Sequence, residues 1–87
     1  MPRVVFTHAV RDRAHWASKR SERVAAFASW GTNVVDHFNI DDANQVAVSV
    51  DVHDLAAMRK AIASPEIEAA KQAHGVLDPL SIYIENR

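Results

Sequence analysis

Five histidines stand out among the residues that could do chemistry, because imidazole changes its charge near neutral pH. His8 falls in the alternating segment 3–10, on the same face as Phe6, and this face is predicted to turn toward the protein interior. An interior histidine can serve as a general base or as a hydrogen-bond donor to a ligand. It can equally be a core histidine bonded to a backbone carbonyl. The residues leave both interpretations of His8 open.

A carboxylate, Asp36, occupies the corresponding face of segment 33–40, which is predicted to be a second strand. A carboxylate in the interior needs a partner or loses its charge. If segment 45–54 lies between the two strands, His8 and Asp36 could approach each other through longer side chains or water. A one-residue slip or a bulge would instead turn Asp36 into solvent.

Trp16 and His74 are further candidates for a binding site. Trp16 lies in the first predicted helix, where it can be a packing anchor, a wall of a ligand site, or both. His74 shares a helical stripe with Ile67 and could close a site; as a cation at a helix C-terminus it would also interact favourably with the helix dipole. Of the other histidines, His53 ends a predicted strand and His15 is expected to be exposed.

On the opposite face of the predicted sheet, His37, Asp51 and Tyr83 could form a polar network or bind a divalent metal. No H-x-H or H-x-x-x-H pair is present to fix two metal ligands locally, and the chain has no cysteine. Two glycines cannot build a phosphate-binding or dinucleotide-binding loop. We therefore expect a structural hydrogen-bonded network, no metal and no cofactor.

The elements that must position these residues are organised around residues 45–54, QVAVSVDVHD, where valine occupies every second position. In the first helix, Val24, Phe27 and Ala28 are predicted to form the apolar stripe, and Gly31 is predicted to end the helix in a left-handed conformation. Gly75 is predicted to end the second. The predicted elements are strands at 3–10, 33–40, 45–54 and 79–85, and helices at 13–29 and 55–74, the latter interrupted at Ser64–Pro65.

The resulting order, βαββαβ, predicts a ferredoxin-like α+β domain that spans residues 1–87. Its antiparallel sheet has four strands, with both helices on one face. Strands 3–10 and 45–54 are the most apolar and are expected in the middle. The other face is predicted to be uncovered within one chain and to carry Thr7, His37, Asn39, Ser49, Asp51 and Tyr83.

Composition excludes several classes of function. The formal net charge is −1, from ten basic and eleven acidic residues, which argues against a nucleic-acid-binding protein. The local basic run of Arg11, Arg13, Lys19, Arg20 and Arg23 is predicted to be the solvated face of a helix. No apolar run reaches the roughly 18 residues of a membrane span, and no signal-peptide pattern is present. We expect a cytoplasmic protein that binds neither nucleic acid nor membrane.

Several short motifs occur in a familiar order. They are Val10-x-Asp12-x-x-x-Trp16, Gly31, the turn from Asp42 to Val46, Asp54-Leu55, Ser64-Pro65-Glu66, and Gly75-Val76 leading through Pro79. In this order and spacing the chain resembles the dimeric α/β-barrel superfamily, which includes antibiotic-biosynthesis monooxygenases and small cyclase-like proteins. The resemblance covers nearly the whole chain.

The resemblance implies a homodimer in which the uncovered faces of two sheets meet and form a barrel. It also implies a ligand cavity in each subunit, between the sheet and the helices. It does not choose a reaction, because members include cofactor-free oxygenases, isomerases, haem degraders and proteins without known activity. The haem-degrading pattern of asparagine, tryptophan and histidine is not convincingly present here.

Two hypotheses of function follow. The first is a cofactor-independent monooxygenase or cyclase/isomerase that acts on an apolar small molecule. His8 would transfer the proton, Phe6 and Trp16 would shape the pocket, and Asp36 or His74 would assist. The alternative is a dimer without catalytic activity that binds a small apolar ligand or has a stress or regulatory role.

Overall fold

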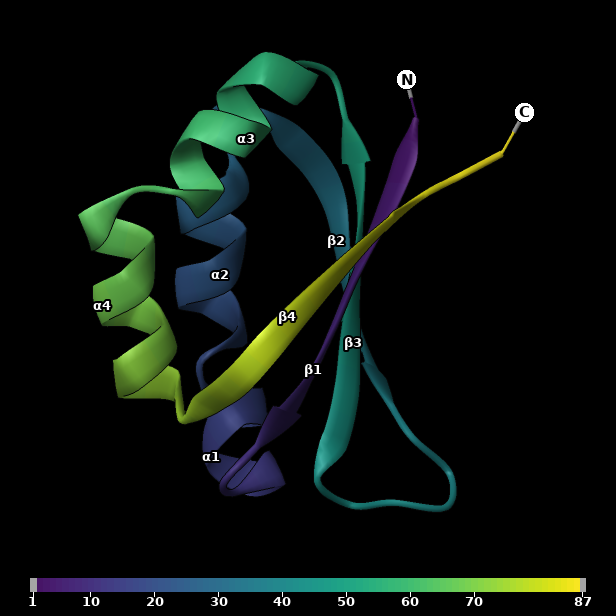
Figure 1. The fold of residues 1–87 in the computed structure, drawn as a ribbon, viewed down its shortest axis with the longest axis vertical. Helices are drawn as coiled ribbons and strands as arrows, with labels where there is room; N and C mark the ends of the chain where they lie inside the picture. The colour runs from purple at the N-terminus through teal and green to yellow at the C-terminus, as the bar shows by residue number, and fades with distance from the viewer. Residues whose placement is uncertain (1, 87) are drawn as a thin grey trace.

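The computed structural model describes residues 2–86. Four antiparallel strands form one sheet in the order β2-β3-β1-β4, and all four helices lie on one face of it (Figure 1). The predicted ferredoxin-like α+β fold is therefore confirmed, with each predicted helix divided in two. The elements are β1 (Arg3–Val10), α1 (Arg13–Ser18), α2 (Arg20–Phe27), β2 (Gly31–Phe38), β3 (Gln45–Val52), α3 (Leu55–Ile62), α4 (Pro65–His74) and β4 (Val76–Ile84).

The two inner strands, β1 and β3, supply most of the core from the sheet. They pair in antiparallel register, with Phe6 opposite Val48 and Val4 opposite Val50. Side chains on the even positions of both strands face the helices, as their alternation predicted. The buried members from these strands are Val4, Phe6, Val10, Val46, Val48, Val50 and Val52.

The predicted helix 13–29 is wrong in two respects. It is interrupted at Lys19 (φ −95°, ψ 12°), and its second part ends at Phe27. The predicted apolar stripe is also only partly right: Phe27 is buried in α2 as expected, but Arg23 is buried with it, whereas Val24 is exposed. Asp12 caps α1 as expected, and its carboxylate accepts a hydrogen bond from the backbone N–H of His15.

Gly31 does not end a helix in the left-handed conformation, contrary to the prediction. It is the first residue of β2, and a side chain there would have no room, because a Cβ atom would lie 2.6 Å from Cγ2 of the buried Val50. Gly75 does have the predicted role, with φ 74° after α4. The predicted capping by Asp54 and Ser64 is also present, since each side chain accepts a backbone N–H of the helix that follows.

The outer strands begin earlier than predicted. β2 covers Gly31–Phe38 rather than 33–40, so Ile40 lies beyond it and is 97% exposed. β4 begins at Val76 rather than 79. β4 is an edge strand, and this location tolerates Pro79, which has no N–H to donate.

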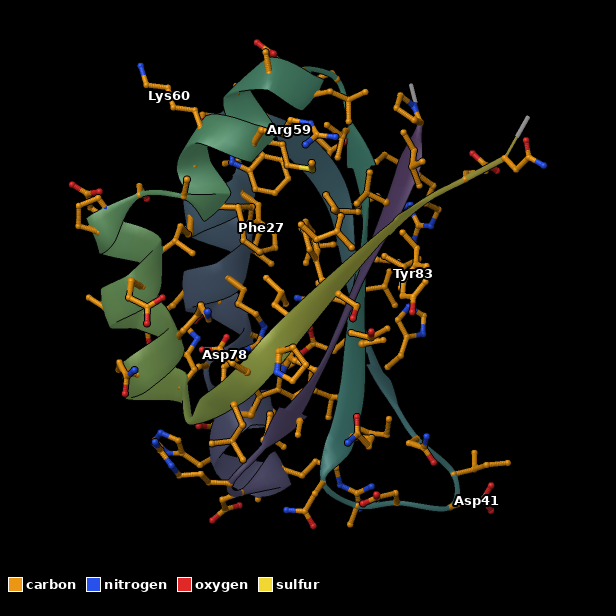
Figure 2. The ribbon with its side chains drawn as sticks, viewed as in Figure 1. Phe27, Asp41, Arg59, Lys60, Asp78 and Tyr83 are labelled. Atoms are coloured by element: carbon orange, nitrogen blue, oxygen red, sulfur yellow. The ribbon has the colours of Figure 1, made fainter. Side chains whose placement is uncertain are left out.

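A polar network covers the face of the sheet opposite the helices. Arg3 contacts Asp51 (Nη1–Oδ1, 2.8 Å) and Ser49 (Nη2–Oγ, 2.7 Å), and the ring of His37 lies 2.8 Å from the same Ser49 hydroxyl. Figure 2 shows Tyr83 on this side and Phe27 between the helices and the sheet. The side chains expected on the uncovered face are thus partly joined to one another by hydrogen bonds.

None of the helices in residues 2–86 is long and apolar enough to cross a membrane. Within the same residues, no group of three or more histidine and carboxylate side chains is arranged to hold a metal ion.

Candidate functional site

A pocket of about 230 Å³ lies between the helices and the sheet. Its apolar wall comes from strands and helices alike, through Phe6, Phe27, Val48, Ile62, Ile67 and Leu80. The polar side chains that line it are His8, Glu22, Arg23, Lys71 and His74. Apolar walls with a few polar groups are characteristic of small-molecule sites.

The sequence-predicted site residues do not all reach this pocket. Phe6, His8, Trp16 and His74 line it. Asp36 does not, although it lies on the helix-facing side of β2 and contacts Arg23, which lines the pocket. The structure therefore brings four of the five together directly and connects the fifth through one side chain.

His8 is buried, with 7% of its surface exposed, and its Nδ1 lies 3.0 Å from the backbone oxygen of Ala9. A carbonyl oxygen only accepts hydrogen bonds, so we assign the proton of the neutral ring to Nδ1. Nε2 then carries a lone pair. The carbonyl contact expected of a core histidine is present, and it also orients the ring and fixes the tautomer that a general base needs.

The edge strand bulges beside His8. Thr7 pairs with Ser81 and Ala9 pairs with Leu77, so one residue of β1, His8, stands opposite three of β4, residues 78–80. His8 has no partner in β4, and Leu80, from the bulged segment, lines the pocket. Bulges are frequent beside functional sites, where they re-aim side chains.

Trp16 is fully buried and contacts both His8 of β1 and Arg23 of α2. Its ring meets the ring of His8 edge-on at 5.9 Å between centroids, and the guanidinium carbon of Arg23 lies 4.0 Å from the Trp16 ring centroid. The interruption at Lys19 separates the two helices that carry Trp16 and Arg23. Stacking of this kind combines cation–π attraction with apolar packing.

Arg23 is the principal polar residue that the sequence analysis missed. The basic run of residues 11–23 predicts a solvated Arg23, but the side chain is only 6% exposed. Its Nη2 donates to Oδ2 of Asp36 at 2.7 Å, and the Asp36 side chain is 13% exposed. The alternative in which Asp36 turns into solvent is therefore wrong, and Asp36 meets Arg23 rather than His8. The spacing of seven between Trp16 and Arg23, two helical turns, was the available signal.

His74 closes one side of the pocket, where its Nε2 lies 3.7 Å from Oε1 of Glu22. Burial lowers the pKa of His74 below 6.5, the nearby Arg23 charge lowers it further, and Glu22 acts in the opposite direction. Burial likewise lowers the pKa of His8; its Ala9 hydrogen bond opposes this, and the charges of Arg23 and Lys71 add to the lowering. Burial thus favours the neutral form of both imidazoles.

These lowered pKa values predict acid destabilisation. Below about pH 6.5 the unfolded chain binds more protons than the folded protein, so the free energy of unfolding falls as pH decreases toward the folded-state pKa of each histidine. Urea denaturation at pH 7.5 and 5.0 measures the loss. The variants His8→Gln and His74→Gln are expected to lose less stability over this range than wild type, whereas exposed His53→Gln should match wild type. Equal pH dependence in all four proteins would contradict this origin.

The comparison with solved structures finds close matches over the entire chain. A proposed antibiotic biosynthesis monooxygenase from Bordetella bronchiseptica superimposes with a TM-score of 0.77 at 14% identity, over 99% of this chain and 95% of that one. This chain has the fold of the antibiotic biosynthesis monooxygenases. SnoaB, a cofactor-independent oxygenase from Streptomyces nogalater, matches with a TM-score of 0.70 at 18% identity, over 99% and 93% of the two chains.

A third match is a proposed antibiotic biosynthesis monooxygenase from Deinococcus radiodurans, with a TM-score of 0.64, 17% identity, and coverage of 100% of this chain and 92% of that one. No family model and no curated protein sequence matches the chain. The superfamily resemblance expected from the short motifs is confirmed at the level of the fold.

Proposed function

We propose that the pocket binds an apolar small molecule and that His8 transfers a proton in a cofactor-independent oxygenation, cyclisation or isomerisation. The single observation that carries this proposal is the neutral imidazole of His8 on the floor of the apolar pocket, with Nδ1 held by the Ala9 carbonyl. This leaves the Nε2 lone pair as the proton acceptor. The likeness to SnoaB, described as a cofactor-independent oxygenase, supports the oxygenase form.

The proposed first step breaks a C–H bond next to a carbonyl group of the substrate. The proton moves to Nε2 of His8, and the electron pair stays on the substrate as an enolate. Return of the proton at another atom gives an isomer. In the oxygenase form the enolate carbon forms a bond to O2, and the proton returns from His8 to give a hydroperoxide. Loss of the second proton of the original CH2 and cleavage of the O–O bond then release water and leave a carbonyl. The apolar wall keeps bulk water away from the enolate.

The other predicted site residues would act around His8. Phe6 and Trp16 would shape the pocket, and His74 would close it beside Glu22. Asp36 would act only through Arg23, whose guanidinium it holds. This makes Asp36 a positioning residue rather than the catalytic residue predicted from the sequence.

A homodimer remains part of the proposal, with the sheet face opposite the helices as its interface. On this face Tyr83 is 59% exposed; Ile82 and Ile84 of the same edge strand pair with Phe6 and Val4 and so lie on the helix side, where they are 46% and 56% exposed. Such surface on an edge strand is suited to pairing with another chain. The cytoplasm remains the proposed location.

Replacement of His8 by alanine tests the proposed chemistry. The probe is 2-tetralone, a two-ring apolar ketone; exchange of its α-protons in D2O is followed by NMR, and oxygen consumption is measured in parallel. We expect wild type to accelerate exchange and His8→Ala to lose at least about 100-fold of that acceleration. The exposed-histidine variant His53→Ala should retain it.

Sedimentation velocity on the same samples controls for assembly, and both variants are expected to be dimers. Loss of exchange together with loss of the fold or dimer would not support a catalytic role. Equal exchange by His8→Ala and wild type would overturn it. Binding of 2-tetralone without exchange by wild type would favour the alternative of a ligand-binding protein without catalytic activity.

A further inference from the structure

Arg23 has fewer hydrogen bonds than its burial requires. Its Nη2 is bonded to Asp36, but within residues 2–86 its Nε and Nη1 have no acceptor, and neither does Nε1 of Trp16. All three nitrogens are buried, and both side chains line the pocket. Oδ1 of Asp36 also lacks a partner among the described residues, but the three nitrogens carry four N–H groups, more than one oxygen accepts. Because a buried donor without an acceptor is costly, these groups call for a further acceptor supplied from outside the chain.

The charges around the pocket favour an anionic acceptor. Asp36 neutralises part of the Arg23 charge but lies outside the pocket lining. The second cation of the lining, Lys71, is already engaged by Glu68 and Asp78 at 3.3 and 2.8 Å. The carboxylate of the lining, Glu22, has a 60% exposed side chain, so water screens its charge. Arg23 is therefore the buried cation of the lining that retains free donors.

We propose that Arg23 and Trp16 form an anion subsite that binds the carboxylate of a small apolar monocarboxylate. This rests on the proposed function, because the pocket is the one described there. Nη1 of Arg23 and Nε1–H of Trp16 donate to the carboxylate, and the Nη2–Oδ2 bond to Asp36 holds the guanidinium from its other side. A charge-assisted hydrogen bond of this type is about twice as strong as a neutral one.

The dimensions of the pocket restrict the rest of the ligand. Small-molecule sites commonly measure about 300–1,000 Å³, and this pocket of about 230 Å³ is smaller. The aromatic rings of Phe6 and Phe27 and the side chain of Leu80 line it beyond the Arg23–Trp16 stack. The ligand is accordingly a monocarboxylate with one or two rings, or a branched aliphatic acid of similar volume.

Benzoate and its neutral counterpart benzyl alcohol test the subsite by titration calorimetry at pH 7.5. We expect wild type to bind benzoate at least tenfold more tightly than benzyl alcohol. The variant Arg23→Lys keeps the positive charge but loses the planar set of donors, so this preference should disappear.

NMR on wild type provides a measurement that needs no variant. Benzoate should shift the Arg23 Nε–H and Trp16 indole N–H signals. The indole N–H of Trp30 is an internal control, since it also lacks an acceptor among the described residues but Trp30 does not line the pocket. Equal affinity for benzoate and benzyl alcohol, or equal shifts of both indole signals, would overturn the proposal.

One further variant separates this subsite from its alternative. Loss of the benzoate preference in Lys71→Met, with the preference retained in Arg23→Lys, would assign the anion to Lys71 and overturn the proposal. Exchange of the α-protons of 2-tetralone reports on His8, whereas the preference for benzoate over benzyl alcohol reports on Arg23, so the two proposals are measured separately. Failure of the proposed proton transfer would therefore leave the subsite intact, and absence of benzoate binding would leave the His8 experiment unaffected.

Discussion

Replacement of Trp16 by alanine is expected to lower the free energy of unfolding by about 3–5 kcal/mol, the usual cost of deleting a large buried aromatic side chain. Trp16 has no exposed surface, and it contacts His8, Arg23 and Phe38. A domain of this length has a total stability of roughly 4–13 kcal/mol, so the variant should be partly unfolded at 37 °C. Urea denaturation followed by circular dichroism gives the loss directly.

Trp30→Ala is the matched control for this prediction. Trp30 is equally buried, but it packs on Phe6 and Phe27 and does not line the pocket. A similar loss of stability is expected, whereas only Trp16→Ala should change the pocket wall beside His8. A loss below about 1 kcal/mol for Trp16→Ala would show that the helices repack over the deletion and that Trp16 is not the anchor of the core on this side.

Removing Arg23 alone should be nearly as damaging, for an electrostatic reason. Arg23→Met deletes the Nη2–Oδ2 contact and leaves the Asp36 carboxylate buried with neither oxygen bonded, since Oδ1 already lacks a partner among the described residues. Breaking one side of a buried ion pair costs about 3–5 kcal/mol. Urea denaturation of Arg23→Met at pH 7.5 is the measurement.

The double variant Arg23→Met/Asp36→Leu separates the loss of packing from the loss of the charge pair. Replacing both partners of a buried ion pair by apolar side chains is often neutral or stabilising. The double variant is therefore expected to recover most of the stability that Arg23→Met loses. If the losses of the two single substitutions simply added, the pair would not be coupled, and the 2.7 Å contact would have no energetic consequence.

The sheet could be predicted from the sequence because alternation along a strand decides which side chains face the helices. His8 follows Phe6 by two residues, and in the structure both side chains are buried on the same side of β1, as predicted. Asp36 was placed on the correct side of β2 by the same rule, although a register irregularity occurs between Thr32 and Val35. The irregularity sets three residues of β2 against two of β3 and therefore reverses the alternation, but it precedes Val34, so Asp36 keeps the facing that the alternation from Val34 onward predicts.

The helical side of the site could not be predicted in full because the buried stripe of Trp16, Arg23 and Phe27 includes a charged residue. Hydrophobicity alone favours Val24 and Ala28 over Arg23 for the inward stripe, and Lys19 carries no proline or glycine signal of the interruption. The structure instead buries Arg23 and leaves Val24 exposed. Charged side chains are rarely buried unless they are paired. Arg23 of α2 is buried because the carboxylate of Asp36, on β2, lies opposite it.

The interruption at Lys19 also affects how this fold can vary over evolutionary time. In one continuous helix a spacing of seven residues separates two Cα atoms by about 10.5 Å along the axis. Here Trp16 and Arg23 lie on separate short helices, and the junction between them sets their relative placement. An insertion or deletion at that junction would alter the pocket wall while the β1–β3 register stays as it is. One scaffold can thereby acquire new ligand preferences without losing its sheet.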